Sequence, residues 1–236
     1  MTNGLIFTVT ILISLFFILL MLRLGKQGLS GLIVTHIILV SSFGSLIIPL
    51  FGFTTNAGNV FYASIFLTAQ VMALHFGRRA AMRSVWTGFG ALVLFVLLAQ
   101  YSIRLGGTPE SSALASSLHS VFDGLPRLAL ASMVAYLASQ SLNVWLFDLL
   151  RKQMHRKKLW VQSLVAAGAG QAVDSVLFFN IAFAYVLPSD KLLQAMAVGF
   201  GVKLFVAIVG LLVLYASYGV VQIAGSGISD QAGGKD

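Results

Sequence analysis

Ionisable side chains stand inside three apolar stretches of this sequence, where a charge is costly. Asp174 lies near the middle of the stretch Leu159–Leu187, and Lys203 lies within Leu192–Val221. Arg127 lies one turn into a third stretch. An ionisable group in a membrane-spanning helix costs roughly 2.5–3.5 kcal/mol on insertion scales, and such groups mark binding sites, relays or ion pairs. Asp174 is therefore the first candidate for a ligand-binding carboxylate, with Lys203 or Arg127 as its counter-ion.

Uncharged polar and small residues recur around these three groups at helical spacing. The last three stretches each contain one stripe of residues on one helix face: Ser132, Tyr136, Gln140 and Asn143; Gln171, Asp174, Ser175 and Phe178; and Gly199, Lys203, Ala207 and Gly210. The segment Gly168–Gly170 precedes the second stripe, and its small residues let a neighbouring helix approach closely. We expect the three stripes to face a shared interior.

The same residues also have a purely structural interpretation. Polar stripes bind helices to one another, at about 0.6 kcal/mol per hydrogen bond, and this role suits Gln140, Asn143 and Ser175 as well as ligand binding does. Lys203 could be the structural counter-ion of Asp174. The Arg127 side chain, near a helix end, could instead extend to the lipid headgroups. Both interpretations stay open at this point.

Seven long apolar stretches supply the helices that must position these groups. They are Leu5–Leu22, Gly31–Phe53, Val60–Phe76, Trp86–Ile103, Leu125–Phe147, Leu159–Leu187 and Leu192–Val221. Each approaches or exceeds the roughly 20 residues that a helix needs to cross a bilayer. They are too long and too uniformly apolar for the strands of a membrane barrel. The predicted fold class is therefore an all-α polytopic membrane protein with seven transmembrane helices.

Basic residues gather on alternate connections, which predicts the orientation of the chain. They follow the first, third and fifth stretches: Arg23 and Lys26; Arg78, Arg79 and Arg83; and Arg151, Lys152, Arg156, Lys157 and Lys158. The other connections, Thr54–Asn59, Gly106–Gly124 and Pro188–Lys191, hold a single lysine. Because Lys and Arg stay on the cytoplasmic side, we expect the N-terminus outside and the C-terminus inside. The Ser- and Gly-rich Gly106–Gly124 is typical of a mobile lid or a linker.

Composition excludes several classes of protein. With 58% hydrophobic and only 9% charged residues, the chain is not a soluble domain. Its net charge of +8 belongs mostly to the basic connections, so the predicted partner is the lipid bilayer and not nucleic acid. The cluster Arg151–Lys158 could also contact anionic headgroups. Since there is no cysteine, disulfides, thiolate catalysis and iron–sulfur ligation are excluded. No metal and no cofactor are predicted.

One membrane domain, 1–236, accounts for the whole sequence. We expect an extra N-terminal helix and basic loop over 1–30, a six-helix core over 31–222 and a flexible tail over 223–236. The first apolar stretch has basic residues after it and none before it, which is typical of a retained anchor and not of a cleaved signal.

A resemblance to a known family rests on four segments. They are Arg127-Leu-Ala-Leu-Ala-Ser-Met-Val-Ala-Tyr136 with Gln140 and Asn143-Val-Trp-Leu-Phe147; Gln171-Ala-Val-Asp174-Ser-Val-Leu-Phe-Phe179; Lys203-Leu-Phe-Val-Ala207; and Phe76-Gly77-Arg78-Arg79. Together they resemble the queuosine-precursor transporter family, also called the vitamin uptake transporter family, over residues 31–220.

This resemblance implies a core similar to the substrate-binding subunits of energy-coupling-factor vitamin transporters. It also implies uptake of a 7-deazaguanine such as preQ0 or preQ1 across the bacterial inner membrane. The ring N1–H and the exocyclic amine of such a base are adjacent donors, which one carboxylate accepts together. The implied substrate-binding residues are Asp174, Gln171, Gln140, Asn143, Arg127, Lys203, Tyr136 and Phe178. The amides would bind the ring edge and the aromatic rings would cover its faces.

The sequence departs from the family pattern at three places. The family usually has an acidic residue at the position of Gln70 and another near Leu74, and it often has Asp at the position of Asn143. The pair Leu211-Leu212 replaces a Thr-Pro pair. The substrate, and any proton coupling through the missing carboxylates, therefore stays open, and a different base-like or vitamin-like molecule is an alternative.

A retinal protein and a membrane hydrolase are alternatives to a transporter. In a retinal protein, Lys203 would form a Schiff base with Asp174 as counter-ion, but Gly199 stands where such proteins carry an acid. A membrane hydrolase is not indicated, because no Gly-x-Ser-x-Gly or His-Glu-x-x-His motif is present, so we expect a transporter and not an enzyme. The sequence does not separate a self-sufficient carrier from a binding subunit that needs an energising module, nor a monomer from a homo-oligomer.

Overall fold

The computed structural model describes residues 3–232 except 45, 51, 106–107, 123–124, 155–157 and 184–188. Its helices are α1 (Asn3–Leu22), α2 (Gly25–Phe43), α3 (Gly58–Phe76), α4 (Arg78–Ser102), α5 (Ser112–Phe122), α6 (Leu125–Gln153), α7 (Leu159–Phe183) and α8 (Ser189–Ala232). A hairpin of β1 (Ile47–Leu50) and β2 (Phe53–Asn56) joins α2 to α3, and a 3-10 turn, η1 (Pro109–Ser111), precedes α5.

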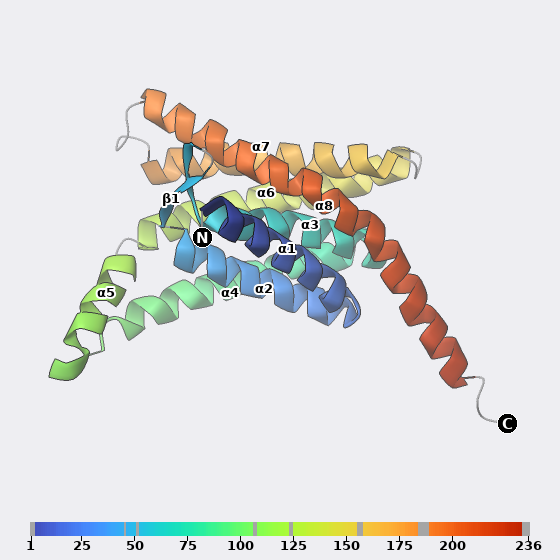
Figure 1. Ribbon diagram of the computed structural model, residues 1–236, viewed down its shortest axis with the longest axis horizontal. Helices are drawn as coiled ribbons and strands as arrows, with labels where there is room; N and C mark the ends of the chain where they lie inside the picture. The colour runs from blue at the N-terminus through green and yellow to red at the C-terminus, as the bar shows by residue number, and fades with distance from the viewer. Residues whose placement is uncertain are drawn as a thin grey trace.

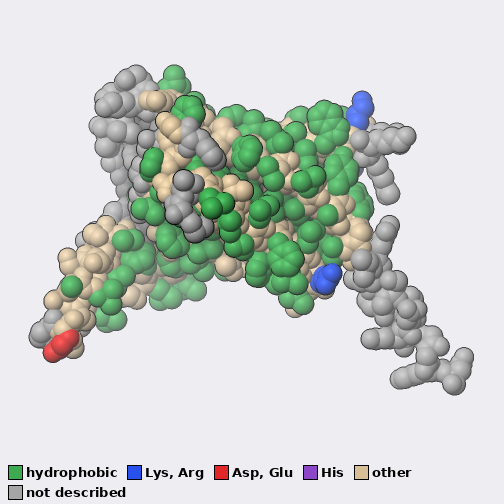
Figure 2. Space-filling view, viewed as in Figure 1, with side chains coloured by type: hydrophobic (Ala, Val, Ile, Leu, Met, Phe, Trp, Pro, Cys, Tyr) green, Lys and Arg blue, Asp and Glu red, His purple; other side chains and the backbone are tan. Residues whose placement is uncertain are grey.

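Seven of the described helices are long and apolar enough to cross a membrane. This confirms the predicted all-α polytopic fold, and the protein is a multi-pass membrane protein. Hydrophobic side chains cover most of the face shown in Figure 2, and the basic and acidic groups visible there lie toward its ends. That surface suits a hydrocarbon surrounding, in which exposed apolar side chains carry no penalty.

Helix α3 is the centre of the bundle. In its membrane-spanning window 78% of the residues are buried, whereas no other span reaches half. It packs against α1, α2, α4, α6, α7 and α8, and it runs through the middle of the molecule in Figure 1. A polar side chain on α3 is therefore enclosed by protein on all sides, which makes this helix a natural wall for a site.

Glycines allow the two sharp corners that follow α1 and α3. Gly25 has φ +69° and Gly77 has φ +84°, a conformation that favours glycine because it has no Cβ. The Gly77 N–H closes α3 by donating to the Ala73 carbonyl at 3.1 Å. Helix α4 then begins at Arg78, so the basic residues Arg78, Arg79 and Arg83 lie in its first two turns.

The second apolar stretch is not one helix, and here the expected span Gly31–Phe53 is wrong. Helix α2 begins earlier, at Gly25, and ends at Phe43, and the rest of the stretch forms the antiparallel hairpin, with Ile47 opposite Asn56 and Leu50 opposite Phe53. Apolarity alone does not distinguish a buried strand from a helix. Pro49 lacks the N–H that a helix would need, and Gly52 has φ +84° at the hairpin turn.

The described part of the connection expected over Gly106–Gly124 has helical structure. It contains η1 and α5, which extends away from the other helices in Figure 1. The end of α5 is attached to α4 because Gln100 Nε2 donates to the Phe122 carbonyl at 2.7 Å. At the C-terminus, α8 continues to Ala232, so the helix passes through most of the tail expected over 223–236. Residues 233–236 lie outside the described part.

Candidate substrate-binding site in the bundle interior

Asp174 on α7 and Lys203 on α8 form an ion pair inside the bundle. Lys203 Nζ donates to Asp174 Oδ2 at 2.6 Å, and the two side chains are only 5% and 6% exposed. Tyr62 on α3 donates its hydroxyl proton to the other carboxylate oxygen, Oδ1, at 2.5 Å. Both oxygens of the carboxylate are therefore engaged by protein groups, which offsets the cost of holding the charge away from water.

Tyr62 links this ion pair to a fourth helix. Its hydroxyl oxygen lies 3.2 Å from Ser139 Oγ on α6, and Lys203 Nζ lies 4.8 Å from the centroid of its ring, within cation–π range. Tyr62 is not among the site residues predicted from the sequence, because a tyrosine in an apolar run counts as a hydrophobic residue. A signal was available, since Tyr62, Phe66 and Gln70 recur every four residues on one face of α3.

Three buried polar side chains beside this centre have no hydrogen-bond partner within the described part of the chain. They are Gln140, next to Ser139 on α6, and Gln171 and Ser175, one turn before and directly after Asp174 on α7. Both amide atoms of each glutamine and the serine hydroxyl are unpaired. Leaving such a group unpaired costs about 1–3 kcal/mol. Polar atoms of this kind require an explanation, and a bound polar molecule is one.

Asn143 belongs to a separate network that joins α3, α6 and α7. Gln70 Nε2 donates to Asn143 Oδ1 at 2.8 Å and to the Ser163 carbonyl at 3.0 Å. Ser163 Oγ donates to Gln70 Oε1 at 2.5 Å, and Asn143 Nδ2 donates to the Phe66 carbonyl at 3.2 Å. Both ends of the Asn143 amide are thus occupied, so its predicted substrate contact would require these bonds to open.

Comparison with known protein families gives a match that covers the helices on which these polar residues stand. The family model described as "Putative vitamin uptake transporter" matches residues 56–217, which is more than half of the chain. The chain belongs to the vitamin uptake transporter family. The matched range contains Tyr62, Asp174 and Lys203 together with the unpaired Gln140, Gln171 and Ser175. Membership of a transporter family also removes support from the retinal interpretation.

Three relatives within this transporter family have names that state a substrate. A "Probable queuosine precursor transporter" of Bacillus subtilis is 29% identical over 72% of this chain and 74% of its own length. A Haemophilus influenzae protein of the same name is 30% identical, over 72% and 70%. The "Queuosine precursor transporter" of Escherichia coli is 28% identical, over 66% and 69%. No solved structure matches the chain, so the likeness to energy-coupling-factor subunits stays a prediction.

Three further residues predicted for the site, Tyr136, Phe178 and Arg127, lie in surroundings that differ from one another. Tyr136 is buried, and its hydroxyl donates to the Val85 carbonyl on α4 at 3.2 Å, so it connects α6 to α4. Phe178 is half-buried and packs edge-on against Phe179, with ring centroids 5.4 Å apart. Arg127 is in the first turn of α6, but its side chain lies outside the described part of the chain.

Proposed function

We propose that this protein imports a queuosine precursor, a 7-deazaguanine such as preQ0 or preQ1, across the bacterial inner membrane. Its membership of a transporter family supports the general activity. The names of three relatives, which the match covers over 74%, 70% and 69% of their own lengths, support the substrate class. The structural observation that carries the proposal is the paired Asp174 carboxylate, with unpaired Gln171 and Ser175 beside it on α7 and unpaired Gln140 on α6.

The unpaired groups match the edge of a deazaguanine. The two amides supply two N–H₂ donors and two carbonyl acceptors, and Ser175 supplies a hydroxyl that does both. The ring carbonyl of the base needs a donor, and its N–H groups need acceptors. Asp174 would accept the adjacent N1–H and exocyclic amine in a charge-assisted pair. The face of the ring would lie against an aromatic side chain such as Tyr62 or Phe178.

Substrate binding at Asp174 has to compete with groups of the protein. Lys203 holds Oδ2 and Tyr62 holds Oδ1, so a base that binds both oxygens displaces both. These two residues come from α8 and α3, whereas Asp174 is on α7. Displacement therefore loosens α7 from its two neighbours, and this is how substrate binding would promote the change from one open side to the other that transport requires.

Uptake by cells tests the proposal. A bacterial strain that depends on an external precursor would express the full-length protein, and the queuosine content of its tRNA would be measured at limiting preQ0 or preQ1. We expect Asp174→Asn to abolish uptake per molecule of protein in the membrane, and the amount of protein is measured because this variant leaves Lys203 without its partner. Asp148→Asn is the matched control, because Asp148 is also buried and paired with a lysine, Lys152, but lies a turn from the end of α6.

Each outcome has a distinct meaning. Normal uptake by Asp174→Asn would rule out the binding role of this carboxylate. If the wild-type protein supports no uptake of either base, the proposed substrate is wrong. Uptake into liposomes that contain the purified chain alone would identify a self-sufficient carrier, whereas binding without uptake would identify a subunit that needs an energising module. The same liposomes, with an orientation-specific protease, would test the predicted outside N-terminus and cytoplasmic C-terminus.

A further inference from the structure

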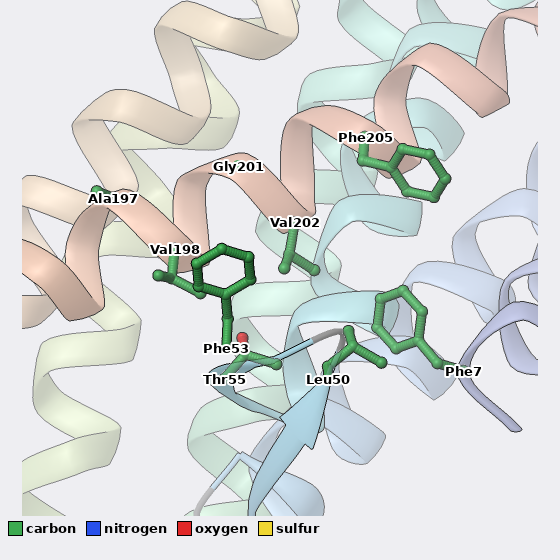
Figure 3. A pocket seen from close by; sticks show the side chains of 9 residues that line it. All are labelled: Phe7, Leu50, Phe53, Thr55, Ala197, Val198, Gly201, Val202 and Phe205. Atoms are coloured by element: carbon green, nitrogen blue, oxygen red, sulfur yellow. The ribbon is translucent and has the colours of Figure 1, made fainter. Parts of the chain in front are cut away.

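An apolar pocket lies on the side of α8 that faces away from Asp174. It has a volume of about 490 Å³ and is enclosed by Phe7 of α1, by Leu50, Phe53 and Thr55 of the hairpin, and by the Ala197–Phe205 face of α8. Figure 3 shows the rings of Phe7 and Phe205 on one side of it and that of Phe53 on the other. Helix α8 thus borders two sites, since Lys203 pairs with Asp174 on α7 while Gly201, Val202 and Phe205 line this pocket.

The chemistry of the lining favours an apolar ligand. None of the lining residues is ionisable, and the single hydroxyl, that of Thr55, is engaged because it accepts a hydrogen bond from Asn59 Nδ2 at 2.9 Å. Pockets of this size that select a polar small molecule hold a few convergent polar groups that fix its orientation. A purely apolar lining suits a ligand that needs no orientation by hydrogen bonds, which is a hydrocarbon.

The surroundings of the pocket identify the source of that hydrocarbon. The pocket lies between α1 and α8, which are both membrane-spanning by length and composition. Phe53 and Phe205, 60% and 53% exposed, form its rim, whereas Phe7 and Leu50, 5% and 4% exposed, lie deep within it. Exposed aromatic rings beside two membrane-spanning helices are where we expect acyl chains of the bilayer to lie, and a chain in the pocket would gain dispersion contacts along its walls. A flexible acyl chain is narrower than a helix, whose diameter with side chains is about 10–12 Å, so an acyl chain reaches the buried Phe7 more readily than a helix of a second copy would.

We propose that this pocket binds one acyl chain of a membrane phospholipid. Phe7, Leu50 and Phe53 precede residue 56, where the family match begins, and the α8 residues lie within the match. The bound chain therefore fills the seam between the N-terminal part and the family core. It holds α1 and the hairpin against α8 on the side opposite Asp174. The proposal concerns lipid binding alone and is independent of the transported substrate.

Glycines on α8 provide a matched test. A Cβ added at Gly201 meets no atom within 4 Å, so Gly201→Leu would project into the pocket without a backbone clash. Gly219→Leu is the control, because a Cβ added at Gly219 also meets nothing and Gly219 is not part of the pocket. Purified full-length proteins would be reconstituted with phosphatidylethanolamine that carries a diazirine at the end of one acyl chain. Cross-linked peptides would be mapped by mass spectrometry after illumination.

We expect wild-type protein and Gly219→Leu to be labelled on residues 50–55 and 197–205, and Gly201→Leu to lose that labelling. Equal labelling of Gly201→Leu would overturn the proposal, and so would wild-type labelling spread over the outer faces of the helices without preference for these segments. Protein–protein cross-links through the same segments would overturn it too, in favour of a second copy. The wild-type map decides the question even if Gly201→Leu does not fold.

Discussion

Lys203 lies over the ring of Tyr62, with Nζ 4.8 Å from the ring centroid. The same two residues bind different oxygens of Asp174, Lys203 at Oδ2 and Tyr62 at Oδ1. The cation, the aromatic ring and the carboxylate therefore form a closed triangle among α3, α7 and α8. Because every contact in this triangle supports the other two, removal of any one member should have an effect larger than a single hydrogen bond.

Removal of the Tyr62 hydroxyl should distinguish its two proposed effects. The hydroxyl stabilises the fold, and it competes with the substrate for Asp174 Oδ1. Tyr62→Phe keeps the ring against Lys203 but leaves Asp174 Oδ1 without its donor, at a cost of about 1–3 kcal/mol. The free oxygen then becomes available to a ligand. We expect a lower melting temperature without substrate and a larger increase in melting temperature on addition of preQ0 or preQ1 than in the wild type. Tyr215→Phe, at a largely exposed position on α8, should change neither. An unaltered response of Tyr62→Phe to ligand would contradict the competition.

Truncation of Lys203 should destabilise the protein more than removal of both charges. Lys203→Met leaves Asp174 as an uncompensated buried charge, which costs about 3–5 kcal/mol. The double variant Lys203→Met with Asp174→Asn contains no unpaired charge and should recover most of that stability, yet it should not transport. Thermal unfolding of the four proteins of this cycle, wild type included, in one detergent is the measurement. If the double variant loses as much stability as the two single variants lose together, the ion pair has no coupling energy.

The sequence identified Asp174 and Lys203 because each is costly in a bilayer, whatever the packing around it. It did not separate Gln140 from Asn143, since both stand on one stripe of α6. Only the packing of α3 shows that Gln70 occupies the Asn143 amide and leaves Gln140 unpaired. Tyr62 was missed for a different reason, because a tyrosine within an apolar run counts as a hydrophobic residue. The hairpin was missed because the run Gly31–Phe53 was assigned to a helix by its length and apolarity, which do not distinguish a buried strand from a helix.

Gln171 and Gln70 are both fully buried glutamines, but they should respond in opposite ways to the same substitution. Gln171→Leu removes two unpaired polar atoms, so stability should stay the same or rise while substrate binding is lost. Gln70→Leu breaks its bonds to Asn143 and Ser163 and leaves those partners unpaired. It should lower the melting temperature strongly. Melting curves with and without preQ0 would measure both effects. A large loss of stability in Gln171→Leu would assign that amide to the structure and not to a ligand.

Gly170 should be the glycine that sets how closely α6 and α7 approach. A Cβ added there would lie 2.7 Å from Phe66 Cε1, 2.9 Å from the Ser139 carbonyl oxygen and 3.1 Å from Asn143 Cβ. The carbonyl belongs to the backbone and cannot turn aside, so Gly170→Ala forces the two helices apart at a cost of about 1–3 kcal/mol. Ser139 and Asn143 both touch the networks described above, so this displacement should reduce transport together with stability.

Gly168→Ala is the control two residues away, because a Cβ there meets nothing within 4 Å, and the better helix propensity of alanine should leave it as stable as the wild type or more so. Equal melting temperatures and equal uptake for the two variants would show that the α6–α7 contact tolerates a methyl group at Gly170.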